Sequence, residues 1–353
     1  MRVFASLRRT AVNRSAGLLA SLVAVLLLIM MIVSMITGSV RLNLADVLQM
    51  LGMKLTGNSL SQELLIIEKI LFSLRAPRTL LMVLTGAALA CSGASYQGLF
   101  RNPLADPYLI GVSSGASLGA VIAMSISWPY TRLGTLMTPL MAFFFAILTV
   151  IAVFHLGKIG GVLNMTGLIL AGVAVNAIAS ALTSGWLLIS NSELRYSLSW
   201  MLGGITRSGW EPLTVMVPVL LVGMAGQWAL AYPLNVMQFG DEQAAQLGVS
   251  VQKMRRRIIF FSTLTTATAI AFSGIIGFVG LIVPHMIRLL VGSDYRRLIP
   301  LSILGGGLFL LTADVIARTV IAPQELPVGI LTALTGAPFF LWLLHQVKRK
   351  GEH

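Results

Sequence analysis

Residues 17–37 read GLLASLVAVLLLIMMIVSMIT and contain no charged side chain. About 20 consecutive apolar residues are enough for an α-helix to cross the hydrocarbon core of a bilayer, so this run predicts a membrane-spanning helix. Four arginines precede it, as in the basic region of a signal peptide: Arg2, Arg8, Arg9 and Arg14. The run exceeds the apolar region of about 7–15 residues that is typical of signal peptides, and no A-x-A site follows it. We therefore predict an uncleaved first span.

The composition extends this conclusion to the whole chain of 353 residues. Hydrophobic residues make up 56% of it and charged residues 10%, with a mean hydropathy of +0.88, whereas soluble domains carry about 25% charged residues. Lipid must therefore be the solvent for much of the surface. The net charge of +13 comes from basic clusters between apolar runs, which indicates cytoplasmic loops rather than nucleic-acid binding. The single Cys91 excludes an internal disulfide, and we interpret it as a small packing residue.

We predict an all-α polytopic membrane protein with a single transmembrane domain, 1–353. Ten apolar segments are candidate spans: 17–37, 76–99, 108–126, 137–156, 165–189, 213–232, 258–275, 278–291, 298–320 and 327–346. The eighth segment is short for a perpendicular crossing. Two amphipathic segments, 44–57 and 61–73, are expected on the outer surface, together with the short segment 194–205.

The distribution of basic residues predicts the orientation. With the N-terminus inside, 16 of the 25 Lys and Arg residues fall on the cytoplasmic side. Because cytoplasmic loops carry an excess of Lys and Arg, this favours both termini in the cytoplasm. The arginines that remain on the outer side need an explanation of their own.

An internal repeat supports the count of spans. Residues 88–93 and 269–274 share the pattern A-x-A-x-S-G, and a proline follows ten residues after each glycine, at Pro103 and Pro284. The copies lie in spans two and seven, so an odd offset makes them run in opposite directions. This predicts an inverted repeat of spans 2–5 and 7–10, a common architecture for a transport pathway. Chance similarity is the alternative, because Ala, Ser and Gly are common in membrane helices.

Glycines recur within the third and ninth spans. Gly111, Gly115 and Gly119 are spaced by four residues, and residues 305–307 are all glycine. Small residues allow helix backbones to approach closely, so we predict tight helix packing at these positions. A line of substrate contacts is the alternative.

The loop 233–255 is the longest polar stretch on the predicted cytoplasmic side. Asp241 and Glu242 suit the start of a short helix, where the dipole favours negative charge. Gly248 suits its end in a left-handed conformation. Two short helices with a sharp turn would form a rigid projection able to receive motion from a soluble motor. An ordinary capped loop helix explains the loop equally well.

Several further motifs resemble one family, the iron-siderophore, haem and cobalamin permeases of type II ABC importers. They are RAPR at 75–78, TGAALACSGASYQG at 85–98, RNPLADP at 101–107, GVSSGASLG at 111–119, GFVGLIVPHMIRLL at 277–290, ADVIAR at 313–318, ELPVG at 325–329 and GAP at 336–338. The resemblance keeps motif order from near residue 20 to near residue 347. It is specific for the family and not for the cargo.

The resemblance implies a non-enzymatic permease subunit in the bacterial inner membrane, paired with a second copy or a related permease. It also implies two ATPase subunits, which bind ATP and Mg²⁺, and a periplasmic or lipid-anchored binding protein. The sequence has no G-x-x-x-x-G-K-[ST] motif for cradling nucleotide phosphates, so ATP hydrolysis is expected on another chain and no cofactor on this one. A ferric siderophore is the first expectation for the cargo, then cobalamin, then haem.

The resemblance also assigns roles to individual residues. In the loop 233–255 it implies ATPase coupling, for which the candidates are Asp241, Glu242, Ala245 and Gly248. Arg75, Arg78 and Arg318 match positions that meet acidic residues of the binding protein. Guanidinium groups suit carboxylate pairing at an interface. Anchoring at the membrane interface is the alternative for Arg75 and Arg78, and an i, i+4 ion pair with Asp314 is the alternative for Arg318.

The turn between spans two and three is the candidate cytoplasmic gate. Its two prolines stop helix continuation. By resemblance, this turn and the loop before span five narrow the exit, which makes Asn102, Leu104 and Met165 gate candidates. A purely structural turn is the alternative.

Two other functional classes are less well supported. An ion-coupled secondary transporter usually carries unpaired carboxylates within the membrane, whereas Asp314 has Arg318 available as a partner. An intramembrane enzyme needs a nucleophile with a base, or metal ligands, and we identify no catalytic or metal-binding set. His285 after Pro284 is interpreted as structural. ATP-dependent rather than proton-dependent transport would separate the importer from the secondary transporter.

Overall fold

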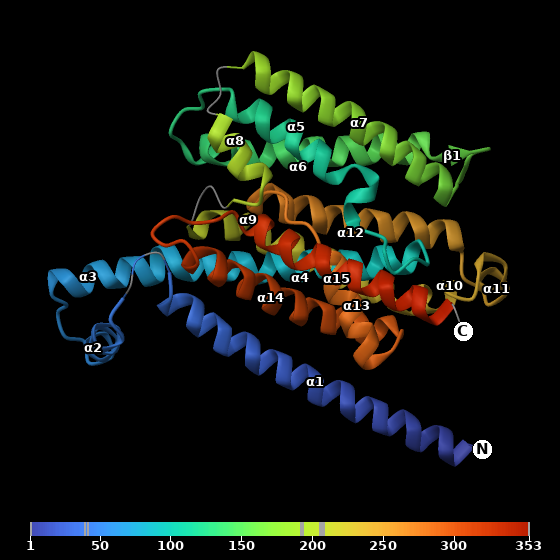
Figure 1. The fold of residues 1–353 in the computed structure, drawn as a ribbon, viewed down its shortest axis with the longest axis horizontal. Helices are drawn as coiled ribbons and strands as arrows, with labels where there is room; N and C mark the ends of the chain where they lie inside the picture. Colours follow the sequence, from blue (N-terminus) through green and yellow to red (C-terminus); the bar gives the residue numbers. More distant parts are fainter. Residues whose placement is uncertain (1, 39, 41, 191–193, 205–208, 352–353) are drawn as a thin grey trace.

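The computed structural model describes residues 2–38, 40, 42–190, 194–204 and 209–351. Within these residues the fold is a helical bundle, in which ten helices run mostly along the long axis of the molecule (Figure 1). They are α1 (Arg2–Ile36), α4 (Ala76–Leu99), α5 (Val112–Met124), α6 (Arg132–Leu156), α7 (Met165–Ile189), α9 (Trp210–Ala229), α12 (Val251–Ser273), α13 (Val279–Val291), α14 (Tyr295–Thr319) and α15 (Val328–Gly351). These correspond to the ten predicted spans.

Shorter elements lie at the two ends of the bundle. One end carries α2 (Leu44–Leu55), α3 (Gln62–Glu68), the π-helix η1 (Lys69–Arg75) and α8 (Leu194–Met201), and we call it the α2 end. The other carries the 3₁₀ helix η2 (Pro107–Ile110), the strands β1 (Lys158–Ile159) and β2 (Val162–Leu163), α10 (Ala231–Met237) and α11 (Asp241–Gln246). We call it the α11 end.

Membrane-crossing character is clear for most of the ten helices by length and composition. Among the described residues, six helical stretches are long and apolar enough to cross a bilayer, and α5, α13 and the first part of α15 are shorter apolar helices. The remaining helix of the ten, α12, begins seven residues earlier than the predicted span 258–275. Its first turns carry four basic residues, which the sequence pattern assigned to the loop, but the backbone there is already helical.

The helix that leads into α4 also differs from expectation. The predicted outer segment 61–73 is not separate, because α3, η1 and α4 form one continuous helical stretch from Gln62 to Leu99. Pro77 lies in the first turn of α4, and the π-helical turn directly precedes it. A proline cannot donate to the preceding turn, and the wider turn accommodates the missing hydrogen bond.

The two predicted halves run in opposite directions. In Figure 1, α4 runs from the α2 end to the α11 end, whereas α12 runs back, and the following three helices of each half are likewise opposed. This is the arrangement that the repeated A-x-A-x-S-G pattern predicted.

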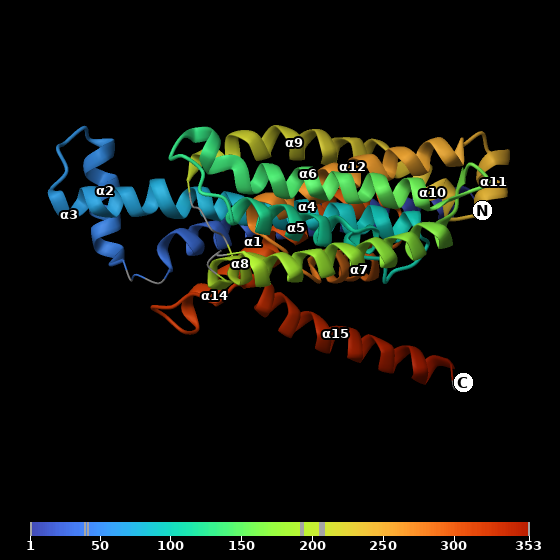
Figure 2. The same cartoon turned by 90° about the horizontal axis from the view of Figure 1, so that it is seen from above.

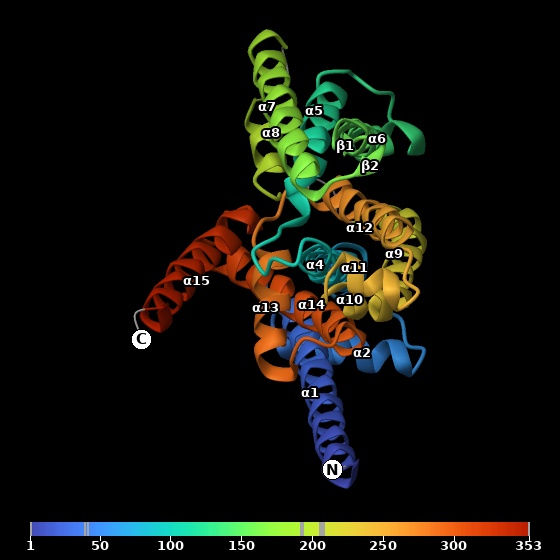
Figure 3. The same ribbon diagram turned by 90° about the vertical axis from the view of Figure 1, so that its right-hand side faces the viewer.

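Glycines allow the central helices to touch. The α4 helix lies in the middle of the bundle against α12, α13 and α14 (Figure 3). A Cβ at Gly86 would lie 2.2 Å from the Gly306 carbonyl oxygen, and one at Gly93 would lie 1.8 Å from that of Gly280. Gly115 and Gly119 meet α6 equally closely. The predicted packing role is therefore confirmed for Gly115, Gly119 and Gly306, whereas Gly111 precedes α5 with a φ of 90° and has no close backbone neighbour. Cys91 is fully buried in the same core.

Two helices lie at the margins of the bundle. Figure 2 shows α15 diverging from the other helices, and Figure 3 shows α7 at the periphery. Large apolar side chains on both helices are exposed: Leu170, Val173, Ile178, Leu182, Leu188 and Ile189 on α7, and Leu334 and Leu341 on α15.

Candidate coupling, gate and docking elements

The α11 helix forms a short rigid projection at its end of the molecule (Figure 1). Gly240 (φ 115°) precedes it and Gly248 (φ 82°) follows it, so positive-φ glycines bound the element on both sides. The two acidic residues of its first turn face the positive end of the helix dipole. Ala244 is fully buried and fixes the helix to the bundle. The predicted short helix ending at Gly248 is confirmed.

The outward surface of this projection combines one charge with apolar side chains. Glu242 and Ala245 are exposed, while Phe239 (71% exposed) and Leu247 (67% exposed) flank the helix. Large exposed apolar groups next to a charge are typical of a protein interface. The coupling role of these residues stays a prediction, but the surface has the character that such a role requires.

Asp241 has a different environment from Glu242. Its Oδ1 lies 2.8 Å from Nη2 of Arg101, and its Oδ2 lies 2.6 Å from Nη2 of Arg255. We call these three side chains the Asp241 clamp. The clamp connects α11 to the turn after α4 and to the first turns of α12. Sequence reasoning did not identify Arg101 or Arg255, because no local pattern links residues so far apart.

The loop before α7 is attached to the same part of α12. Gln252 exchanges two hydrogen bonds with the backbone of Leu163, at 3.3 and 3.4 Å. Nη1 of Arg255 donates to the Leu163 carbonyl oxygen at 3.4 Å. Arg255 therefore contacts both α11 and the loop that leads into Met165.

The gate candidates lie on the two segments that these contacts hold. Asn102 and Leu104 are exposed, and the Asn102 side chain accepts a hydrogen bond from the Leu104 amide at 2.9 Å. Met165 is the first residue of α7 and packs against the core. A Cβ at Gly172 in α7 would lie only 2.2 Å from the Leu109 carbonyl oxygen of η2, so α7 packs directly against the element that follows the Asn102 turn. The gate assignment remains a prediction.

A third contact connects this region to α14. The Asn235 side chain in α10 donates to Asp294 at 2.6 Å and accepts from the amide of Tyr295 at 2.9 Å. The hydrogen bonds of Arg296 hold the pKa of Asp294 at about 2, so this N-cap carboxylate of α14 is ionised at physiological pH. The coupling region thus adjoins α4, α12 and α14.

Two of the three predicted docking arginines have buried side chains. Arg75 donates to the carbonyl oxygens of Met35 and Ile36, at 2.9 and 2.5 Å, and to that of Val40. Arg318 lies 2.9 Å from Asp314, which confirms the predicted i, i+4 pair, and donates to Ser34 Oγ at 2.8 Å. Both guanidinium groups thus neutralise the negative end of the α1 dipole.

Arg78 is the most accessible of the three. Its side chain is 17% exposed and bridges Asp314 at 2.9 Å and Glu325 at 2.7 Å. A small cavity of about 80 Å³ adjoins it, next to the end of α8. Docking of a binding protein by these arginines stays a prediction. Arg78 is the one that a partner can reach most easily, because its side chain is the most exposed.

Replacing Arg75 tests its contacts with α1. We expect Arg75→Met to lower the unfolding temperature of the detergent-solubilised protein, because it leaves part-buried carbonyls unpaired, at a cost of about 1–3 kcal/mol. Arg195→Met, at an exposed arginine of the same end, is the matched control and should shift it little. Equal shifts for the two variants would show that Arg75 has no special structural role.

Metal-binding groups do not gather within the described part of the chain: it contains no cluster of three or more His, Cys, Asp or Glu side chains. His285 packs edge-on against Phe339. Asp314 is almost fully buried between two arginines.

Comparison with known proteins identifies the family. The profile of the FecCD transport family matches residues 26–346. The chain belongs to the FecCD transport family. This FecCD protein is 43% identical over 279 residues to the hemin transport system permease protein HmuU of Yersinia pestis, covering 77% of this chain and 82% of that one. It is also 43% identical over 279 residues to the cobalamin import system permease protein BtuC of Halobacterium salinarum, covering 79% and 74%.

A solved structure extends the likeness to three dimensions. A metal-chelate type ABC transporter in an inward-facing conformation superposes on this FecCD protein with a TM-score of 0.78 and 31% sequence identity. The match covers 94% of this chain and 99% of that one. The resemblance stated from the motifs is therefore confirmed at the level of the family and the fold.

Proposed function

We propose that this chain is the membrane-spanning subunit of an ATP-driven importer that moves a metal chelate into the cytoplasm. The family, the names of the relatives and the fold support this role. The sequence contains no nucleotide-binding motif, which supports the assignment of ATP hydrolysis to a separate subunit. The observation that carries the proposal is the α11 projection, whose exposed surface is directly connected to both gate segments.

In this mechanism the ATPase moves α11, and the Asp241 clamp transmits the motion. Arg101 carries it to the turn that contains Asn102 and Leu104. Arg255 carries it to Leu163 and so to the start of α7. The two gate segments then move together, as a two-state element biased by the ATPase at one face and by a loaded binding protein at the other. The α11 end is cytoplasmic, in accordance with its excess of basic residues.

Reconstitution tests the proposal. The purified chain, together with the ATPase that co-purifies with it, should drive uptake of a chelate into proteoliposomes when ATP is supplied. Uptake that follows a proton gradient instead would favour the ion-coupled alternative. That alternative has little support, because Asp314 is already paired with two arginines. For the cargo we propose a ferric siderophore first, then cobalamin and then haem. Parallel uptake assays with the three chelates would identify which one is transported.

A second copy of the chain completes the pathway in this proposal. The exposed apolar residues of α7 and α15 lie at the margins of the bundle, where a partner copy would bury them. Packing of α7 from one copy against α15 of the other places the pathway between the two chains.

Cysteine cross-linking tests this interface. Leu182 lies about 10 Å along α7 from the C-terminus of that helix, and Leu334 lies about 10 Å along α15 from its N-terminus. Both of these helix termini point toward the α2 end (Figure 1). We expect oxidation of the double variant Leu182→Cys/Leu334→Cys to give a covalent dimer as the main species, because the native Cys91 is buried and unreactive. The control pairs Leu334→Cys with Leu140→Cys on α6, also exposed. A dimer band of equal strength in the control would refute the proposed interface.

A further inference from the structure

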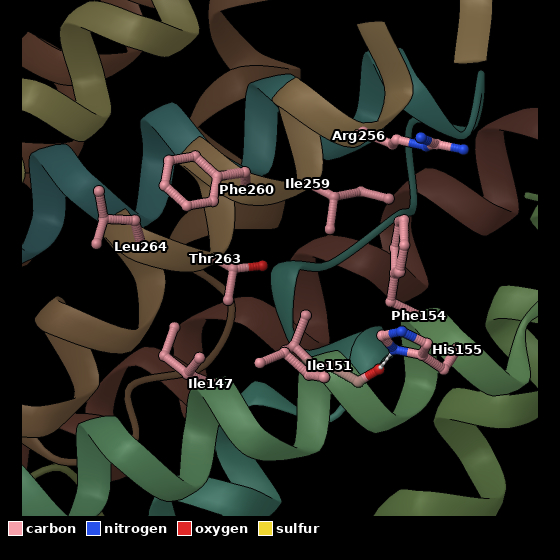
Figure 4. Close-up of a pocket in the computed structure, with 10 residues that line it drawn as sticks. Ile147, Ile151, Phe154, His155, Arg256, Ile259, Phe260, Thr263 and Leu264 are labelled. Atoms are coloured by element: carbon pink, nitrogen blue, oxygen red, sulfur yellow. Dashed lines mark hydrogen bonds between the residues drawn. The ribbon is translucent and has the colours of Figure 1, made fainter. Parts of the chain in front are cut away.

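An apolar groove lies between α6 and α12 (Figure 4). It has a volume of about 380 Å³ and is open on one side. Its walls run from Ile147 to His155 on α6 and from Arg256 to Leu264 on α12. Eight residues of helix rise about 12 Å, which is most of one leaflet of a hydrocarbon core about 30 Å thick.

The walls of the groove suit a hydrocarbon chain. They consist of aliphatic and aromatic side chains, among them Ile151, Phe154 and Phe260 (Figure 4). The hydroxyl of Thr263 also lines the groove, but it is hydrogen-bonded to Tyr96 at 3.3 Å. Because its polar group is already satisfied, this wall offers an acyl chain only apolar surface.

The mouth of the groove at the α11 end is basic. Arg256 lines it from α12, is exposed and has no ion-pair partner among the described residues. On the α6 side, Nζ of Lys158 lies 4.9 Å from the ring centre of Phe154, which lines the groove. His155 donates from Nδ1 to the Ile151 carbonyl oxygen at 2.8 Å. Two cations, neither of which has an ion-pair partner among the described residues, therefore flank the opening where a lipid headgroup would lie.

We propose that this groove binds an anionic phospholipid of the leaflet at the α11 end, with one acyl chain between α6 and α12. The headgroup phosphate then lies between Arg256 and Lys158, since charge complementarity favours an anionic over a zwitterionic lipid. The proposal rests on the membrane orientation given above but not on the transport activity. The lipid-binding assay can therefore fail while transport is intact, and transport can fail while lipid binding is intact.

Native mass spectrometry of the full chain in detergent measures this binding directly, with phosphatidylglycerol and phosphatidylcholine as the probes. We expect Arg256→Gln to weaken phosphatidylglycerol binding about fivefold, the factor for losing one cation next to a headgroup. Phosphatidylcholine binding should change less than twofold. Arg257→Gln is the matched control: Arg257 is also exposed but is turned by about 100° on α12 and does not line the groove.

The acyl chain is tested separately from the headgroup. Ile151→Trp, at a half-exposed position in the wall, fills the groove and should reduce the binding of both lipids. Ile147→Trp is the second variant should the first fail to fold. Inorganic phosphate alone should not displace phosphatidylglycerol, because the groove supplies much of the affinity. Equal effects of Arg256→Gln and Arg257→Gln, full lipid retention in a folded groove-filled variant, or displacement by phosphate would each overturn the proposal.

Discussion

Glu242→Arg should reduce ATP-driven uptake at least tenfold and release the ATPase during purification. Glu242 is exposed on a projection that Ala244 and two positive-φ glycines hold rigid. Reversal of a charge at the centre of an interface places like charges together, which costs several kcal/mol. The side chain contributes no described packing, so the variant should fold normally. Co-purification of the ATPase and uptake into proteoliposomes are the two measurements.

Glu63→Arg is the matched control for this variant. Glu63 is also an exposed glutamate at the second position of a short helix, but it lies at the α2 end, far from the coupling region. It should leave ATPase binding unchanged. The coupling assignment would be wrong if Glu242→Arg transported at the normal rate, or if both charge reversals released the ATPase equally.

Asp241→Asn should separate ATP hydrolysis from transport. It removes the carboxylate that joins Arg101 and Arg255 but keeps the side-chain shape and leaves the exposed Glu242 and Ala245 unchanged. We therefore expect the ATPase to stay bound and to hydrolyse ATP, while uptake per ATP falls at least tenfold. Because Asp241 is partly exposed, the loss of stability should be modest. The ratio of uptake to hydrolysis, measured on the same proteoliposomes, is the quantity that decides.

Arg101→Gln is the comparison for this second variant. It breaks the link to the Asn102 turn but keeps the ion pair between Asp241 and Arg255. If the clamp transmits motion along two branches, this variant should show a smaller fall in the ratio than Asp241→Asn. A normal ratio in Asp241→Asn would exclude the clamp from the mechanism.

Local patterns in the sequence were sufficient to predict the helices and the α11 projection. The bounds of α4 and α7 agree with the predicted spans 76–99 and 165–189, because polar residues, prolines and glycines mark their ends. The start of α12 was misplaced, because basic residues were taken as loop although they continue the helix. Here charge indicates the edge of the membrane and not the edge of the helix.

Contacts between distant segments could not be predicted in this way. Asp241 and Arg101 are 140 residues apart, and Arg75 reaches a backbone carbonyl 40 residues away. The motif resemblance assigned roles to Arg75, Arg78 and Arg318, but it gave no information about the groups that surround these side chains within the chain. The packing of α1 against η1 and against α14 explains why Arg75 and Arg318 are buried.

The uninterrupted helical stretch from Gln62 to Leu99 is 38 residues long. At a rise of about 1.5 Å per residue it measures about 57 Å, more than the roughly 45 Å between the outer limits of the lipid headgroups. If this stretch runs perpendicular to the bilayer, one end of the molecule stands clear of the lipid by roughly 10 Å. A macromolecule that approaches the membrane from the side of this protruding end then contacts protein before it contacts lipid. The distance from the bilayer at which it binds is set by the length of the helix and not by the membrane surface.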